Sequence, residues 1–148
     1  MIARKVHTRI IRRNKKLGNY TVEATWTELD GNRRTELFDS MAEAKRWKVL
    51  INWEDEGRIT NLQRAVDCGY TYELQPGFRD MHGKKWQAWT YTPDFVYVQD
   101  GIEIVEDYKS KHPPAEWRHK ELMFRSLYPE VHFFVNERIR GVYEPPTE

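Results

Sequence analysis

The stretch "YTPDFVYVQDGIEIVEDYKS", residues 91–110, constrains the fold of this chain more than any other segment. Apolar, aromatic and β-branched residues form two runs in it, and the Asp-Gly pair at 100–101 between them is a strong signal for a tight turn. The stretch therefore predicts two antiparallel strands. It also places Asp94 at the start of the first strand, and Asp107 and Lys109 on the second.

Side chains alternate along a strand, which sorts the second strand into two rows. Asp107 and Lys109 share one row, whereas Glu106 lies in the other with Ile104. Asp94 begins the neighbouring strand, so its carboxylate can lie across from Asp107. Two carboxylates from adjacent strands form a hard-oxygen site that suits Mg²⁺ better than Zn²⁺. A lysine beside them can orient water or stabilise charge on a phosphate, which is the chemistry of phosphodiester hydrolysis.

The same spacing has an ordinary explanation. A Pro-Asp pair often starts a turn, and alternating charged residues are typical of the solvent face of any strand. Spacing alone therefore leaves the metal site and the solvated strand both open.

The chain has 148 residues, the length of one domain, and its composition is typical of a folded domain with a polar surface. The lone Cys68 excludes an internal disulfide, and the spacing of the five histidines disfavours a histidine-ligated metal. No apolar run is long enough for a signal peptide or a membrane span, so we expect a soluble, cytoplasmic protein. We expect one domain that comprises a basic arm at 1–18, a hairpin at 20–38, a core at 39–136 and a tail at 137–148.

The remaining segments predict a mixed sheet with helices packed on it, an α/β or α+β fold. A strand, a helix and a strand end the chain, and this unit predicts a parallel strand pair. Residues 84–98 are expected to form either a strand pair or one strand bent at Pro93. We expect the other elements at 19–29 and 33–38 (strands), 39–57 (helix), the residues before Pro76-Gly77 (strand), 101–109 (strand), 113–128 (helix) and 130–135 (strand).

The first sixteen residues contain seven Lys or Arg and no acid. A basic segment of this kind is typical of nucleic-acid binding. A solvated terminal strand or tail explains the same composition, and composition leaves the two interpretations open.

Each predicted helix carries a charged residue inside its apolar stripe. A step of about 100° per residue places Glu43 in the stripe of the first helix, where it needs a partner such as a metal or a lysine. Ser40 and Glu43 also have the spacing of a capping box, in which the glutamate turns back to the start of the helix. In the second helix Lys120 lies in the stripe; its stem can be buried with the ammonium in water, or it can point over the sheet at a phosphate.

Taken together, these residues resemble the PD-(D/E)XK nuclease superfamily. Pro93-Asp94 is followed after twelve residues by Asp107-Tyr108-Lys109, and Glu43 lies on the preceding helix. The predicted order of helix, three strands, helix and strand is the αβββαβ order of that restriction-endonuclease-like core, here with an added N-terminal hairpin. The segments "LFDSMAEAKRW", "YELQPGF", "YTPDFVY" and "VEDYKS" are similar to those of a phage- and prophage-associated family of small, uncharacterised members. The resemblance covers about residues 37–135.

The resemblance implies specific roles for the site residues. Asp94, Asp107 and the backbone carbonyl of Tyr108 would bind Mg²⁺ or Mn²⁺. Lys109 would position the attacking water, and Glu43 would complete the site directly or through water. Strand alternation favours Asp107 over Glu106 as the third residue of the motif, because only Asp107 shares a face with Lys109.

The function implied by the resemblance is a metal-dependent DNA endonuclease acting as a homodimer on branched or junction DNA in phage recombination and packaging, like a Holliday junction resolvase. A transposon-type end-cutting endonuclease that works with partner proteins is an alternative. A DNA-binding module without catalysis is a further one. The residues expected to contact DNA are Lys120, Arg118, Lys111, Arg12, Arg13, Lys15 and Lys16.

Overall fold

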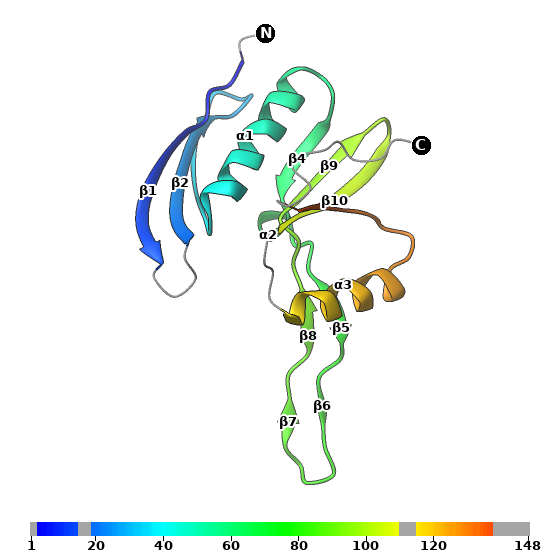
Figure 1. Ribbon diagram of the computed structural model, residues 1–148. Coiled ribbons are helices and arrows are strands. Elements are labelled where there is room, and N and C mark those ends of the chain that lie inside the picture. Colours follow the sequence, from blue (N-terminus) through cyan, green and yellow to red (C-terminus); the bar gives the residue numbers. More distant parts are fainter. Residues whose placement is uncertain (1–2, 15–18, 110–114, 138–148) are drawn as a thin grey trace. The chain divides into compact units, whose positions relative to one another are not determined.

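The computed structural model describes residues 3–14, 19–109 and 115–137 (Figure 1). This part of the chain combines helices with mixed β-sheets, in agreement with the predicted α+β class. It divides into two compact units, Met1–Thr60 and Asn61–Glu148, which are described separately. No helix in the described ranges is long and apolar enough to cross a bilayer. In chain order the elements are β1 (His7–Asn14), β2 (Asn19–Thr27), β3 (Arg33–Phe38), α1 (Met41–Asp55), β4 (Thr60–Arg64), α2 (Ala65–Cys68), β5 (Tyr72–Gln75), β6 (Phe78–Arg79), β7 (Lys85–Trp86), β8 (Trp89–Tyr91), β9 (Phe95–Gln99), β10 (Ile102–Lys109), α3 (Ala115–Leu127) and β11 (His132–Glu137).

The first unit contains an antiparallel sheet in the order β1-β2-β3. The predicted hairpin of β2 and β3 is confirmed, and its turn includes Gly31 at a φ of 91°, a conformation that favours glycine. α1 packs against β2 and β3. The ring of Trp47 on α1 lies 5.3 Å from that of Trp26 and 6.2 Å from that of Phe38, so one aromatic cluster joins the helix to the sheet.

Part of the basic N-terminal segment is a strand. β1 pairs with β2, and the register shifts between Ile10 and Arg12, which marks a β-bulge or irregularity. Arg12 and Arg13 are exposed on this strand. Residues 7–14 therefore form a solvated terminal strand, the predicted DNA contacts of Arg12 and Arg13 stay a prediction, and Lys15 and Lys16 lie outside the described residues.

The predicted helix after Ser40 is confirmed as α1, and the Ser40 Oγ accepts a hydrogen bond from the Glu43 N–H at 3.1 Å. This is the serine half of the predicted capping box, which satisfies one of the free N–H groups at the helix start. The helix also buries Arg46, which is 2 % exposed and was not predicted in the core. Its guanidinium lies 4.8 Å from the ring centroid of Trp53, where a cation is attracted to the aromatic face.

In the second unit, the strands run β11-β10-β9-β4 in one sheet. The predicted hairpin of β9 and β10 is confirmed, and its turn has Asp100 at a φ of 51° and Gly101 at a φ of 78°. Positive φ at both positions is the requirement that makes Asp-Gly a strong hairpin signal. β10 and β11 are parallel, as the strand-helix-strand pattern predicted.

Residues 84–98 form neither a strand pair nor a single bent strand. β7 pairs with β6, β8 pairs with β5, and β9 joins the larger sheet with β10. Pro93 separates β8 from β9, and it lacks the N–H that a continuous ladder would need. The pairs β5–β8 and β6–β7 follow one another along a narrow ribbon that extends beyond α3 (Figure 1).

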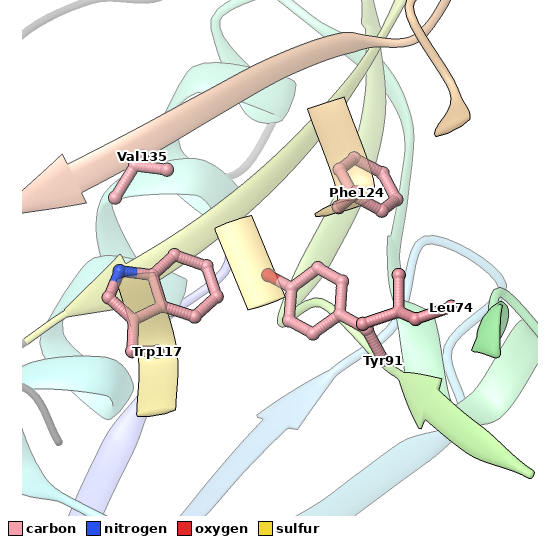
Figure 2. Packing of buried hydrophobic residues seen from close by; sticks show 5 residues of the cluster. All are labelled: Leu74, Tyr91, Trp117, Phe124 and Val135. Atoms are coloured by element: carbon pink, nitrogen blue, oxygen red, sulfur yellow. The ribbon is translucent and has the colours of Figure 1, made fainter. Parts of the chain in front are cut away.

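The core of the second unit forms where α3 packs on β5, β8 and β11. Its buried residues are Leu74, Tyr91, Trp117, Phe124 and Val135 (Figure 2). The ring of Tyr91 lies 5.5 Å from that of Trp117 and 5.3 Å from that of Phe124. This aromatic contact holds α3 and β8 together beside the end of β10 that carries Asp107.

Candidate functional site

Asp94 and Asp107 lie beside one another in the backbone hydrogen-bond pattern of the second unit. The Asp94 N–H donates to the carbonyl oxygen of Glu106 at 3.2 Å, which places Asp94 at the end of the β9–β10 ladder. The Asp94 Oδ2 accepts the N–H of Tyr108 at 2.8 Å. The Asp94 carboxylate therefore rests against the peptide that joins Asp107 to Tyr108, across from Asp107 in the way that the hairpin pattern indicated.

Lys109 contacts the Asp107 carboxylate directly. Its Nζ lies 2.8 Å from the Asp107 Oδ2 and 4.1 Å from the ring centroid of Trp117. The Asp107 side chain is 2 % exposed and that of Lys109 is 24 % exposed, so the acid is buried and the lysine closes it off from solvent. The ion pair and the aromatic face offset part of the cost of burying the carboxylate.

Tyr91 brings a phenolic hydroxyl to the same place. Burial raises the pKa of Tyr91 well above its ordinary value, and the nearby Asp107 carboxylate adds to the shift. The hydroxyl lies close to that carboxylate, but no hydrogen bond of standard geometry joins it to the described residues. Tyr91 is therefore a neutral neighbour of Asp107 and a weaker acid than an exposed tyrosine.

Two buried polar atoms at this place, the Tyr91 hydroxyl and the Trp117 Nε1, make no hydrogen bond of standard geometry within the described residues. The Asp107 Oδ2 beside them has the Lys109 ammonium as its contact. The three residues come from β8, β10 and α3, whose packing brings them together. Because Asp107 is 2 % exposed, it does not lie on a solvated face of its strand.

The donor set fits a divalent cation of the Mg²⁺ type. Proteins bind Mg²⁺ through one or two carboxylates. The other positions of its coordination shell hold water molecules or phosphate oxygens of the substrate. Asp94 and Asp107 supply those carboxylates, and the Asp107 Oδ2 is the oxygen that lies 2.8 Å from the Lys109 ammonium. No set of three or more His, Cys, Asp or Glu side chains in the described ranges is placed to hold a metal ion. The fit therefore rests on two acids.

Glu106 lies on the opposite face of β10, as alternation predicted. Its Oε1 accepts a hydrogen bond of 2.8 Å from the Tyr97 hydroxyl, and the side chain is completely buried. Glu106 is therefore partnered inside the fold on its own face of the sheet.

The metal-binding roles of Glu43 and of the Tyr108 carbonyl stay predictions. Glu43 is half-buried on α1, in the first unit, where its backbone N–H contributes to the helix cap. Tyr108 follows Asp107 on β10, and its N–H is the donor to Asp94.

The predicted DNA contacts on α3 are partly engaged within the protein. The Nζ of Lys120 lies 3.6 Å from the Oε1 of Glu116 and 5.7 Å from the ring centroid of Trp89. This arrangement agrees with a buried stem and an ammonium at the surface. Arg118 is exposed, and its Nη1 lies 2.9 Å from the Oε1 of Glu121, whose side chain is 15 % exposed. Lys111 lies outside the described residues.

Tyr91 and Trp117 were not predicted as site residues. A signal for Tyr91 existed, because it stands three residues before Asp94 in the same extended segment. Trp117 had no such signal, because no sequence pattern indicates that its ring would contact the Lys109 ammonium.

Two surface hollows lie elsewhere. One of about 560 Å³ is bordered by Arg4, His7 and Trp26 in the first unit, and one of about 390 Å³ by Tyr97 and Glu103 in the second. Neither includes Asp94, Asp107 or Lys109 in its lining, so neither bears on the site described above.

Comparison with known proteins gives one match. Residues 22–140 match the family described as "Protein of unknown function (DUF1064)". No curated protein and no solved structure matches the chain. The matched segment covers most of the sequence and includes Asp94, Asp107 and Lys109. The chain therefore belongs to the DUF1064 family.

Proposed function

We propose that this protein is a metal-dependent DNA endonuclease that hydrolyses phosphodiester bonds and prefers branched or junction DNA. The observation that carries the proposal is the Asp107 carboxylate, which is buried at 2 % exposure and whose Oδ2 lies 2.8 Å from the Lys109 ammonium. Asp94 adjoins it through the Tyr108 N–H. Two carboxylates and a lysine on neighbouring strands are the groups that phosphodiester hydrolysis requires.

Each residue has a role in this chemistry. A divalent cation, when bound, would supply Lewis acidity for the scissile phosphate. Asp94 and Asp107 would hold it through their carboxylate oxygens. Lys109, released from its pair with Asp107, orients the attacking water and stabilises negative charge that develops on the phosphate. Tyr91 lies close enough to Asp107 for that charge to raise its pKa further, so its hydroxyl stays protonated and adds no second negative charge to the site.

The resemblance to the PD-(D/E)XK superfamily supports DNA as the substrate. The helix α1, the strands before and after Pro93, the helix α3 and the parallel strand β11 follow one another in an order compatible with the αβββαβ core. The exposed Arg12 and Arg13 on β1 offer phosphate contacts that do not depend on base sequence. The preference for branched DNA and the homodimer rest on the resemblance alone.

The test is a cleavage assay with Mg²⁺ or Mn²⁺ on linear, nicked, flapped and four-way DNAs, with duplex RNA alongside. We expect the wild type to cut DNA and Asp107→Asn to lower the rate about 100- to 1,000-fold, as losses of directly acting polar groups do. The matched control is Glu106→Gln, which alters the neighbouring acid on the other face of β10. It should retain cleavage, because Tyr97 can still donate to the amide oxygen.

A second readout does not depend on cleavage. Mg²⁺ should raise the melting temperature of the wild type and of Glu106→Gln, and it should raise that of Asp107→Asn far less, because a ligand that binds only the folded state stabilises it. If the wild type cuts none of these DNAs, or Asp107→Asn cuts as well as the wild type, the proposal is wrong. DNA binding without cleavage would favour the non-catalytic binding module. Cleavage that occurs only when partner proteins are added would favour the transposon-type endonuclease.

A further inference from the structure

The hairpin of β6 and β7 is an arm that extends away from the second unit (Figure 1). Every residue from 75 to 88 is exposed except Asp80, which is half-buried. Met81 at the tip is 91 % exposed, and Phe78 and Trp86 are about half exposed. Large apolar side chains held so far from a core are unusual, and grouped together they indicate an interaction surface.

The arm is stiffened by local contacts. The Asp80 carboxylate accepts hydrogen bonds from the N–H groups of His82 and Lys84 and from the Trp86 Nε1, at 2.9 to 3.1 Å. Phe78 stacks on Trp86 with 6.2 Å between ring centroids, and the Lys84 Nζ lies 4.1 Å from the centroid of the Trp86 ring. An isolated two-stranded hairpin is marginally stable, so these contacts account for an ordered arm without support from a core.

The base of the arm is also closely fitted. A Cβ at Gly77 would lie 3.1 Å from the Trp86 carbonyl oxygen and 3.2 Å from the Ala88 nitrogen. The two strands therefore approach one another closely there, and a side chain at position 77 would require the opposite backbone to shift. The close strand packing at Gly77 and the hydrogen bonds to Asp80 restrict how the arm can bend relative to the rest of the second unit.

The arm carries a clear positive charge. The arm contains three exposed cations, Arg79, Lys84 and Lys85. It contains one acid, Asp80. The Trp86 Nε1 and the two backbone N–H groups lower the pKa of Asp80, so it is ionised, but its charge is directed into the turn. A stiff two-stranded ribbon with excess cations and an apolar tip is complementary to DNA, whose major groove admits a β-ribbon.

The arm is joined directly to the candidate site. β8 continues from β7 after two residues, and it carries Tyr91 beside Asp107. At about 3.3 Å per residue, six residues from Tyr91 to Lys85 span roughly 20 Å. At 3.4 Å per base pair this distance corresponds to about six base pairs.

We propose that the β6–β7 arm is a DNA-binding element that selects branched DNA, an inference that rests on the endonuclease function proposed above. Lys84, Lys85 and Arg79 contact phosphates of the duplex about half a helical turn from the cleaved bond. Met81 packs on an unstacked base at the branch point, as apolar side chains do when they insert at disrupted base steps. The cations therefore contribute affinity for any DNA, whereas Met81 contributes the preference for branches.

The experiment measures binding of the full chain to a labelled linear duplex and a labelled four-way DNA in EDTA, over a series of salt concentrations. We expect Lys84→Gln/Lys85→Gln to weaken binding to both DNAs about tenfold and to reduce the salt slope by about two, since each phosphate contact contributes about 0.9. Met81→Ser should weaken binding to the four-way DNA about fivefold and leave the linear duplex within about twofold.

Matched controls separate these effects from general losses. Lys45→Gln/Lys48→Gln removes two exposed cations from α1, and Leu122→Ser removes an exposed apolar side chain from α3. Both should bind as the wild type does. Melting curves of all variants identify any that fail to fold, and Met81→Ser should fold normally because its side chain makes little contact.

The outcomes distinguish this inference from the proposed function. Suppose that the wild type binds and cuts DNA and that Asp107→Asn does not cut. If the arm variants then bind DNA as the wild type does, the inference about the arm is wrong, while the proposed endonuclease function is supported. If the wild type neither binds nor cuts DNA, both are wrong. If Met81→Ser leaves DNA binding unchanged and alters the oligomeric state in light scattering, the arm contacts protein rather than DNA, which also overturns the inference.

Discussion

The two faces of β10 carry neighbouring acids that are equally buried but differently partnered. Glu106 is fully buried and accepts a hydrogen bond from Tyr97. Asp107 is 2 % exposed, and its Oδ2 lies 2.8 Å from the ammonium of Lys109, which is 24 % exposed. On one face the buried acid has a buried partner inside the fold, and on the other its partner is a lysine that solvent also reaches. The difference teaches that two acids of equal burial can differ in how readily their partners could be exchanged for a ligand.

The largest effect that should sharpen this comparison comes from Lys109. We expect Lys109→Ala to lower cleavage about 100-fold, or about 2.7 kcal/mol in transition-state stabilisation, because a charge positioned at the phosphate is lost. The variant should also unfold more easily, since Asp107 stays buried without its cation. Steady-state cleavage rates and urea unfolding measure the two effects. Lys48→Met, which alters an exposed lysine on α1, should change neither; an equal effect of both variants would contradict a specific role for Lys109.

A smaller effect compares the two tyrosines that accompany these acids. Tyr97→Phe removes the donor to a buried carboxylate, so it should lower the free energy of unfolding by about 1–3 kcal/mol. Tyr91→Phe removes a hydroxyl that makes no hydrogen bond in the described chain, so it should change that free energy by less than about 0.5 kcal/mol. Urea unfolding of both variants is the measurement. If Tyr97→Phe and Tyr91→Phe lowered the free energy of unfolding equally, the proposed difference in hydrogen bonding between the two faces of β10 would be wrong.

The smallest effect concerns Asp80, a half-buried acid on the arm. Its carboxylate accepts hydrogen bonds from the N–H groups of His82 and Lys84 and from the Trp86 indole. The hydrogen bond from the Trp86 indole lowers the pKa of Asp80 below its ordinary value of 3.8. A lowered pKa in the folded state means that this carboxylate stabilises the arm fully above pH 3.8, and that the contribution is lost as the pH falls through the lower folded value. The Trp86 indole N–H resonance, followed by NMR, should therefore shift only in strong acid. In Asp80→Asn that acid-dependent shift should be absent; its persistence would assign the transition to another group.

Much of the local structure around the site was predictable from neighbouring residues. The Asp-Gly turn at 100–101 and the alternation along β10 placed Asp107 and Lys109 on one face and Glu106 on the other, as the structure has them. Ser40 predicted the start of α1 in the same way. Turns, caps and alternation involve groups within a few residues of one another, so a short segment contains the information that they need.

Other features depend on segments that are distant in sequence. Residues 84–98 split among separate sheets because β5 and β6 supply partners for β8 and β7, which no pattern within the segment indicates. Arg46 is buried on α1 although a charged residue in a helix is expected at the surface. The basic segment at the N-terminus became strand β1 because β2 offered it a free edge.

The sequence by itself determined the α+β class, the β9–β10 hairpin, the helix α1 and the side of β10 on which the acid and the lysine lie. Only the tertiary structure decided that Tyr91 and Trp117 join Asp107 and Lys109, because β8 and α3 reach that place through the packing of Phe124, Leu74 and Val135. Hydrogen-bond satisfaction is a property of the assembled surroundings of an atom, not of its neighbours along the chain. For that reason Asp94, Asp107 and Lys109 could be named as candidates from the sequence, while the aromatic surroundings that Tyr91 and Trp117 give them could not.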